Sequence, residues 1–276
     1  MRKLPLVVAS LLLLGTATAA KLKDQTRSEF EEYVASAEAS MDKAIKGEQP
    51  YLWVDSLPGE RERLRNGNVL VDRVGATKSI QIKDGLIHDW IGAVFIPATF
   101  NDVTELLKDY DSHEDIYPEV VDSKLLEMDG NRLRGYLRLK KKQIITVVLS
   151  TEHEVTYYQV DEDRWHSRSY STRVSEVSNV GKPSEHELPD GEGRGFMWKL
   201  YAYWRFEEVE DGVFAECRTI SLSRKIPFGL GFLISPFIDG LPRESLFGML
   251  TATRNAVHSS QINARVRRKD LEDYGS

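Results

Sequence analysis

The chain of 276 residues is long enough for one large domain or two small ones, and 41% apolar residues with dispersed charges indicate a globular protein. The formal net charge of −6 does not favour nucleic acid or an anionic surface as a partner. The only cysteine, Cys217, excludes an internal disulfide, so the chain must fold by packing alone.

The first 20 residues have the organisation of a cleaved export signal. Arg2 and Lys3 form a basic start, Leu4–Leu14 is a short apolar run, and Ala17-Thr18-Ala19 is a small-residue cleavage site. This run is too short to cross a bilayer as a helix, which takes about 20 residues. Its removal leaves 35 basic against 43 acidic residues, a net charge of −8. We therefore expect a soluble protein of the periplasm or the extracellular space.

An amphipathic helix is predicted over Lys23–Lys46, followed by a loop-rich joint over Gly47–Pro58. The apolar side chains that share one face of the helix are Phe30, Tyr33, Val34, Ala37, Met41 and Ile45. The helix either packs on a sheet or extends as a spacer, and the sequence leaves both open. We expect residues 21–60 to form this helix and its linker, 61–262 the main domain, and 263–276 a polar tail.

Two short strands are predicted at Asn68–Arg73 and Ser79–Ile82, and a longer one at Gly85–Ile96. A second helix begins after Thr99, because Thr99 and Asp102 match the capping pattern in which each side chain accepts a hydrogen bond from the other's backbone. The apolar stripe of this helix is Phe100, Val103, Leu106, Leu107 and Tyr110. The helix ends in an acidic run.

Beyond residue 120 the apolar period changes from 3.6 to 2, which indicates β-strands. The strand candidates are 121–126, 132–141, 144–155, 165–177, 196–207 and 213–223. Asp211-Gly212 is the strongest hairpin turn, and a polar loop over 179–194 joins two of the strands. Consecutive strands without helices between them imply an antiparallel sheet.

A long helix is predicted over Leu241–Ser260. Pro242 suits a first helical position, and the Glu244 carboxylate suits the positive end of the helix dipole. The apolar stripe consists of Leu246, Met249, Leu250, Thr253 and Val257. Since no second apolar helix of this length lies among the strands, we expect this helix to cover one face of the sheet.

Short motifs match exported bacterial members of one superfamily. They are Leu107–Asp111 before Ile116-Tyr117-Pro118, Val120–Leu126, Gly195–Trp198 through Tyr203–Phe206, Leu222–Pro227, and Pro242–Leu246. With the order of elements, they make the chain similar over Asn66–Val257 to the START and polyketide-cyclase-like (SRPBCC) superfamily. The resemblance implies an α+β helix-grip fold, in which a curved antiparallel sheet wraps around a long C-terminal helix and a ligand cavity. Here an N-terminal amphipathic helix is added.

Many members of that superfamily bind lipids, sterols or other hydrophobic ligands, and some cyclise polyketides. The strand Phe196–Phe206 fits this, because its even positions are all apolar and four of them are Trp or Phe rings, at 196, 198, 204 and 206. An aromatic inner face suits a sterol, an acyl chain or a polycycle, although the rings can equally fill a core beneath the helix. The predicted ligand-binding residues are Phe196, Trp198, Leu200, Trp204, Thr219, Leu246 and Leu250.

The hairpin turn decides which residues of the next strand face inward. A two-residue turn pairs Trp204 with Thr219 and places Cys217, Thr219 and Ser221 on the inner face. A three-residue turn instead places Glu216 and Arg218 there, as a polar anchor for a ligand headgroup. The sequence modestly favours the first arrangement.

No metal site or cofactor is predicted, because the six histidines include no H-x-x-x-H or H-E-x-x-H spacing. One basic cluster comprises Arg132, Arg134, Arg138, Lys140, Lys141 and Lys142. We interpret it as a solvated strand face, with a landing patch for anionic lipid headgroups as the alternative. Nucleic acid is not expected as a partner of an exported acidic protein.

The apolar segment Ile226–Leu241 precedes the long helix and is too interrupted by Gly and Pro to span a membrane. We predict Phe228, Phe232 and Phe237 as a gate that touches a membrane transiently while a ligand is loaded. The alternative is that the segment packs inward and closes one end of the core.

The predicted function is therefore binding, extended to transfer, of a hydrophobic small molecule or lipid between the sheet and the C-terminal helix. The lack of paired catalytic groups argues against an enzyme. The alternatives are a cyclase or aromatase-like enzyme and an envelope interaction module with a closed cavity. The sequence does not determine the oligomeric state.

Overall fold

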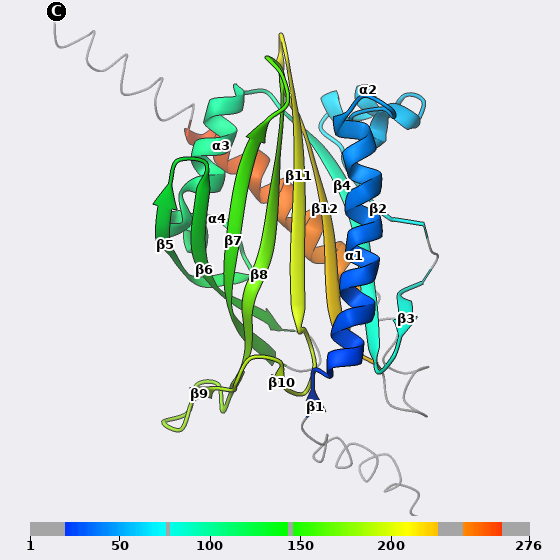
Figure 1. Ribbon diagram of the computed structural model, residues 1–276. Helices are drawn as coiled ribbons and strands as arrows, with labels where there is room; N and C mark the ends of the chain where they lie inside the picture. The colour runs from blue at the N-terminus through cyan, green and yellow to red at the C-terminus, as the bar shows by residue number, and fades with distance from the viewer. Residues whose placement is uncertain (1–19, 76–77, 143–145, 226–239, 261–276) are drawn as a thin grey trace, which may run out of the picture.

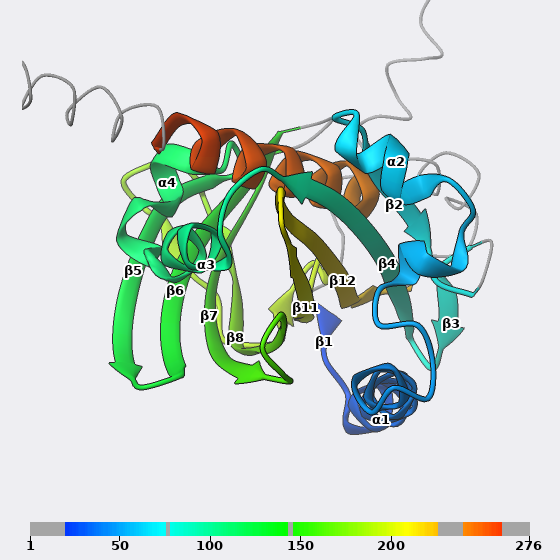
Figure 2. The same cartoon turned by 90° about the horizontal axis from the view of Figure 1, so that it is seen from above.

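A computed structural model of the chain describes residues 20–75, 78–142, 146–225 and 240–260. The fold is α+β, as predicted. A large antiparallel sheet curves around the C-terminal helix (240–260), and helix α1 (Asp24–Ile45) lies on the opposite, convex side (Figures 1 and 2). Of the predicted leader only Ala20 lies within the described residues, and it forms the short strand β1 (Ala20–Lys21).

The strand order is β2-β4-β12-β11-β8-β7-β6-β5, with every neighbouring pair antiparallel, while β3 pairs with β4 and β9 with β8. The strands are β2 (Val69–Arg73), β3 (Ile80–Ile82), β4 (Gly85–Ile96), β5 (Val120–Asp129), β6 (Arg132–Lys142), β7 (Thr146–Gln159), β8 (Arg164–Ser178), β9 (His186–Glu187), β11 (Lys199–Val209) and β12 (Gly212–Arg224). A two-residue strand, β10 (Glu192–Gly193), pairs with β1. The central strands are thus β4, β12, β11 and β8.

The predicted capping pattern forms at the start of α3 (Phe100–Lys108). The Asp102 N–H donates to Thr99 Oγ1, and the Thr99 N–H donates to Asp102 Oδ2, each at 3.2 Å. Beyond α3 the acidic run forms two short helices that its composition did not predict, η3 (Tyr110–Ser112) and α4 (His113–Ile116). The joint after α1 likewise contains η2 (Trp53–Ser56), and α2 (Glu60–Arg65) follows it.

Helix α1 packs against the convex face of the sheet and does not extend as a spacer (Figure 2). Its apolar stripe is buried against Tyr201 and Tyr203 of β11 and against apolar residues of β12. Polar groups add to this contact, since the hydroxyls of Tyr170 and Tyr203 donate to Glu38 of α1 at 2.6 and 2.9 Å. The Tyr33 hydroxyl of α1 donates to Asp89 of β4 at 2.7 Å. Apolar burial and hydrogen bonds to the sheet together fix α1 in place.

Two buried ion pairs lie on this convex side. Arg218 Nε donates to Asp89 Oδ1 at 2.9 Å, beneath α1. Arg205 pairs with Glu216, whose carboxylate also accepts the Trp53 N–H at 2.5 Å and so holds η2 against the sheet. Each carboxylate has more than one donor, which offsets the cost of removing it from water.

Four of the six residues of the basic cluster of β6 form ion pairs with acidic side chains. The ion pairs are Arg132–Glu154, Arg134–Glu152, Arg138–Glu185 and Lys141–Glu119. This supports a solvated strand face over a free landing patch for anionic headgroups. No helix within the described residues is long and apolar enough to span a membrane.

The polar loop after β8 is held by the buried carboxylate of Glu176. Glu176 Oε2 accepts the Arg194 N–H at 2.7 Å, and Oε1 accepts the Phe196 N–H at 2.8 Å. A side chain at Gly193 would place its Cβ 2.6 Å from this carboxylate, so only glycine fits there. The loop and β1 therefore form one connected edge.

Candidate functional site

The two faces of β11 and β12 contact different helices, because side chains alternate along a strand. Trp204, Phe206 and Cys217 belong to the core cluster that includes the C-terminal helix. Tyr201 and Tyr203 belong to the cluster that includes α1. We call the side of the sheet toward the C-terminal helix the inner face.

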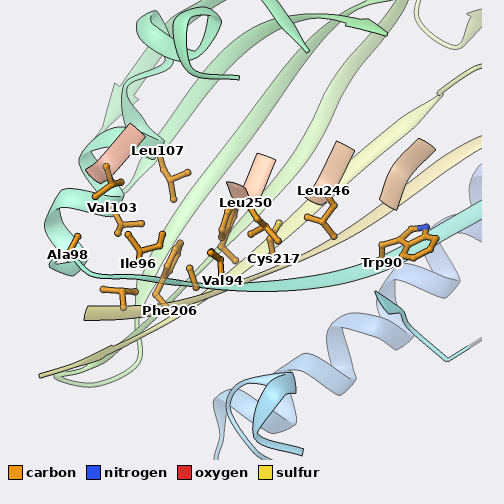
Figure 3. Close-up of a cluster of buried hydrophobic side chains, with 14 residues drawn as sticks. Trp90, Val94, Ile96, Ala98, Val103, Leu107, Phe206, Cys217, Leu246 and Leu250 are labelled. Atoms are coloured by element: carbon orange, nitrogen blue, oxygen red, sulfur yellow. The ribbon is translucent and has the colours of Figure 1, made fainter. Parts of the chain in front are cut away.

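The part of the inner face near α3 is tightly packed (Figure 3). Val94, Phe206 and Leu250 are each fully buried there. The C-terminal helix comes close because β4 carries Gly92, where a Cβ would lie 2.7 Å from Leu250 Cδ1 and 2.9 Å from the backbone oxygen of Leu70. This part of the inner face has no room for a ligand.

Farther along the same face the packing is incomplete. Leu200, Ala202 and Thr219 face inward from β11 and β12, yet all three are only half-buried. Edge strands are often half-exposed, but these two strands have neighbours on both sides. The described residues therefore leave the middle of the inner face partly uncovered.

The register brings hydroxyl side chains together at this position. Ser169 of β8 lies opposite Ala202 of β11, which in turn lies opposite Thr219 of β12. One row along, Ser171 and Ser221 face the same way. We call Ser169, Ser171, Thr219 and Ser221 the hydroxyl floor.

Three of these hydroxyls have no hydrogen-bond partner among the described residues: Ser169, Thr219 and Ser221. Their oxygens are nevertheless not among those sealed from solvent, in contrast to Trp90 Nε1, which is buried without a partner. Ser171 Oγ accepts the Leu200 N–H at 3.0 Å. The floor thus offers unused hydrogen-bonding groups to the space above it.

His153, Tyr117 and Cys217 are further polar groups of the inner face. His153 of β7, in the same row as Ser171, contacts Thr151 Oγ1 through Nε2 at 3.1 Å, and burial lowers its pKa to about 4. Burial also raises the pKa of Tyr117, whose hydroxyl lies 3.1 Å from Thr253 Oγ1, to about 12. Burial raises the pKa of the Cys217 thiol as well, so this group is not an activated nucleophile. The arrangement suits binding through neutral hydrogen bonds.

The predicted ligand-binding residues occupy three different environments. Trp204, Leu246 and Leu250 lie in the packed cluster beneath the helix, and Leu200 and Thr219 lie where the inner face is half-covered. Ligand contact by these five residues stays a prediction.

The placement of Phe196 and Trp198 on the inner face was wrong. Strand β11 begins only at Lys199, so the alternation that included residues 196 and 198 does not extend to them. Trp198 is buried in the cluster with α1, and Phe196 is 36% exposed. The cause is the Glu176 carboxylate, which binds the Phe196 N–H and turns the chain before the strand begins.

The predicted hairpin register was also wrong, by two residues. The turn consists of Glu210 and Asp211, because Val209 already pairs with Gly212, and Trp204 lies opposite Cys217. A Cβ at Gly212 would lie 2.4 Å from the backbone oxygen of Ile96, so glycine belongs inside this crowded strand start. A shift of two residues keeps the faces unchanged. Thr219 and Cys217 therefore face inward as in the favoured arrangement, and Glu216 and Arg218 lie on the α1 side.

Sequence reasoning placed Thr219 and Ser221 on the inner face but missed Ser169, Ser171 and His153. The signal was present in the run Arg164–Ser171, where serine occupies every second position from Ser167 onward. The alternation indicated a strand, but small hydroxyl residues do not by themselves show which face is buried. The predicted gate residues Phe228, Phe232 and Phe237 lie outside the described residues.

A separate hollow of about 420 Å³ lies at the surface, near the tips of the β7–β8 and β11–β12 hairpins. Its arginines are already paired, Arg61 with Asp55 and Glu207, and Arg164 with Asp161. This lining suits water better than an apolar ligand.

The chain is similar to several solved structures. A STAR-related lipid transfer protein from Xanthomonas axonopodis is 18% identical, with a TM-score of 0.45 over 65% of this chain and 97% of that one. Human STARD10 is 10% identical, with a TM-score of 0.43 over 79% and 86% of the two chains. The Zhui aromatase/cyclase from Streptomyces sp. R1128 is 11% identical, with a TM-score of 0.42 over 62% and 94%. No family model matches the chain, and no curated protein matches it in sequence. At these identities the likeness concerns the fold alone.

Proposed function

We propose that this protein binds a hydrophobic ligand between the inner face of the sheet and the C-terminal helix. The observation that carries the proposal is the half-burial of Leu200, Ala202 and Thr219 on central strands, directly beside a region packed to full burial. A protein interior is normally close-packed, so inward-facing side chains of central strands should be covered. A bound apolar ligand supplies the missing cover and gains the free energy of leaving water.

A substitution that fills the space separates a hollow from a filled core. Ala202→Phe adds a ring at the half-covered position and should change the free energy of unfolding by less than about 1 kcal/mol if the space is empty. Ala215→Phe is the matched control, because Ala215 faces the same way from the same hairpin but is 1% exposed. Overpacking there should cost about 1–3 kcal/mol or more.

The binding assay uses the same two variants. Protein purified from the compartment in which it occurs is examined by native mass spectrometry and lipid extraction. Delipidated protein is then titrated with a fluorescent fatty acid or sterol. Ala202→Phe should lose the bound mass and the fluorescence change. If Ala202→Phe destabilises as much as Ala215→Phe and no apolar probe binds wild type, the core is closed and the protein is an interaction module.

We extend the proposal to export and loading. The support is the sequence of residues 1–20, in which a basic start, a short apolar run and the small-residue motif Ala17-Thr18-Ala19 follow one another as in a cleaved export signal. N-terminal sequencing of the native protein tests this. An uncleaved chain in the cytoplasm would contradict it.

The gate remains part of the proposal. Changing Phe232 and Phe237 together to Ser should lower liposome association and the rate of ligand transfer, with a melting temperature within a few degrees of wild type. A large loss of stability with unchanged binding per folded molecule would mean that the segment is core.

A further inference from the structure

We infer that the hydroxyl floor recognises uncharged oxygen atoms of the ligand, so that the ligand is a neutral amphiphile with hydroxyl, ester or keto oxygens and not a plain hydrocarbon. This inference rests on the proposed function, since it names the chemical class that the same site takes. A hydroxylated polycycle and a neutral ester lipid share this chemistry.

The first reason is the unused hydrogen-bonding capacity of the floor. Ser169 and Ser221 are 9% and 7% exposed and Thr219 is half-buried, and none of their hydroxyls has a partner among the described residues. Solvent can reach these oxygens, so a ligand that covers them must supply hydrogen bonds or leave buried polar groups unsatisfied. Three such groups on one face can bind a ligand oxygen, because the described residues supply no partner for them.

The second reason is their arrangement. The floor residues come from β8 and β12, with β11 between them contributing Ala202 and Leu200. Neighbouring strands are about 4.8 Å apart, so the hydroxyls are spread over roughly 10 Å, with apolar side chains among them. A ligand that is apolar but carries oxygens at more than one point matches this pattern.

The third reason is which of these groups donate and which accept hydrogen bonds. Hydroxyls donate and accept, while the indole N–H of Trp90, in the same row as Thr219, can only donate. This N–H is buried without an acceptor and is sealed from the open space, and Trp90 lies at the end of the packed cluster beyond Leu246 (Figure 3). Each floor hydroxyl, in contrast, can donate to an oxygen acceptor on the ligand and can also accept from a ligand hydroxyl.

The fourth reason is charge. Asp89 of β4 and Glu216 and Arg218 of β12 lie on the α1 side of the sheet. Glu176 of β8 faces inward, but its carboxylate is bound to the Arg194 and Phe196 N–H groups. The floor itself consists of neutral groups. A cation does lie nearby, since the Arg73 guanidinium stacks 4.2 Å from the Trp90 ring centroid at the β2 end of the row. A carboxylate-bearing probe therefore has to be part of the test.

The test uses three pyrene probes with the same apolar body: decylpyrene, pyrenedecanol and pyrenedecanoate. Each is titrated into the delipidated full mature chain, and energy transfer from the tryptophans reports binding. Decylpyrene binding to wild type tests the proposed function. The affinity ratio of pyrenedecanol to decylpyrene tests the floor, because changes in general apolar binding cancel in that ratio.

The variant is Thr219→Val with Ser221→Ala, which removes two floor hydroxyls at nearly constant volume. It should lower the pyrenedecanol to decylpyrene ratio about tenfold, the loss expected for one to two hydrogen bonds. Thr156→Val is the matched control, because Thr156 lies on the outer face of β7, opposite Arg132 and Arg168. It should leave the ratio unchanged. Thr219→Ser keeps the hydroxyl and should retain the wild-type ratio.

The outcomes separate the two ideas. An unchanged ratio in the double variant, with decylpyrene still bound, overturns the floor inference and leaves the proposed function standing. If the double variant loses affinity for pyrenedecanoate but not for pyrenedecanol, the floor binds a carboxylate, and the assignment of an uncharged ligand is overturned. No binding of any probe to wild type overturns both. Urea denaturation of each variant verifies folding, and the single variants Thr219→Val and Ser221→Ala replace the double variant if it is unstable.

Discussion

Leu250→Ala tests whether the C-terminal helix is the centre of the fold. The Leu250 side chain is fully buried, and its Cδ1 lies against the backbone of Gly92 on β4. Truncating a buried leucine removes its transfer free energy and leaves a cavity, which together cost about 2–5 kcal/mol. We expect the upper half of that range, because the contact is with sheet backbone, which cannot easily collapse into the gap. Phe247→Ala on the same helix is the control, since Phe247 is 43% exposed and should change stability by less than about 0.5 kcal/mol.

A double-mutant cycle makes the test specific to this contact. Gly92→Ala alone should destabilise strongly, because its Cβ would meet both Leu250 Cδ1 and the backbone oxygen of Leu70. In the Leu250→Ala background the first of these clashes is gone. Gly92→Ala should therefore lower the free energy of unfolding less in the Leu250→Ala background than in wild type. The coupling energy should be of the order of 1 kcal/mol or more.

The assay is equilibrium urea denaturation followed by tryptophan fluorescence, with the free energy of unfolding taken from the midpoint and the slope. The slopes of the variants must match that of wild type for the comparison to hold. If Leu250→Ala costs less than about half a kcal/mol, or if the two substitutions are simply additive, the helix does not grip the sheet through this contact.

Three further predictions concern other parts of the fold. Phe30→Ala should destabilise by about 3–5 kcal/mol, because Phe30 is fully buried between α1 and the sheet, whereas Ser40→Ala on the exposed side of α1 should have little effect in the same urea assay. Arg205→Met should cost about 3–5 kcal/mol by leaving the buried Glu216 carboxylate without its cation, and a smaller change would mean that the Trp53 N–H alone satisfies it. Burial holds the pKa of His153 at about 4, against 6.5 in the unfolded chain, so the unfolded chain binds more protons between these values and stability should fall as the pH drops from 6.5 to 4. His153→Gln should remove about 3 kcal/mol of that fall, and an unchanged pH profile would contradict the assigned pKa.

Strong local patterns predicted the elements, because they depend on neighbouring residues alone. The segment Gly85–Ile96 was predicted as a strand whose bounds agree with β4 to the residue, and Thr99 with Asp102 predicted the start of α3. The apolar stripe of the C-terminal helix was predicted from spacing, and its members Leu246 and Leu250 are buried. Each of these predictions depended only on residues within one helix or one strand.

The errors arose where a distant group decides the local structure. Phe196 and Trp198 continue the alternation of β11 in sequence. The Glu176 carboxylate lies 20 residues earlier than Phe196 and accepts its N–H, so the chain turns there and does not continue the strand. Gly212 looked like a turn residue, yet it is needed inside β12 because the chain after β4 passes close to it. Neither Glu176 nor the Ile96 backbone is marked in the sequence near the residue it controls. The docking of α1 was open for the same reason, since its partners lie on strands more than 100 residues away.

The two faces of the β11–β12 hairpin differ in how well their polar groups are satisfied. On the convex side the buried ions have partners, since Arg218 binds Asp89 and the Glu216 carboxylate has two donors, although Thr26 Oγ1 and Trp198 Nε1 have none. On the inner face of the same strands, the cheaper hydroxyls of Thr219 and Ser221 have no partner among the described residues. Hydroxyls are easier to satisfy than buried ions, so a fold selected for stability alone would not leave this pattern. Departures from internal consistency are expected at functional sites. The convex side fixes the strands, and under the proposed function the inner face keeps its hydrogen bonds for a ligand.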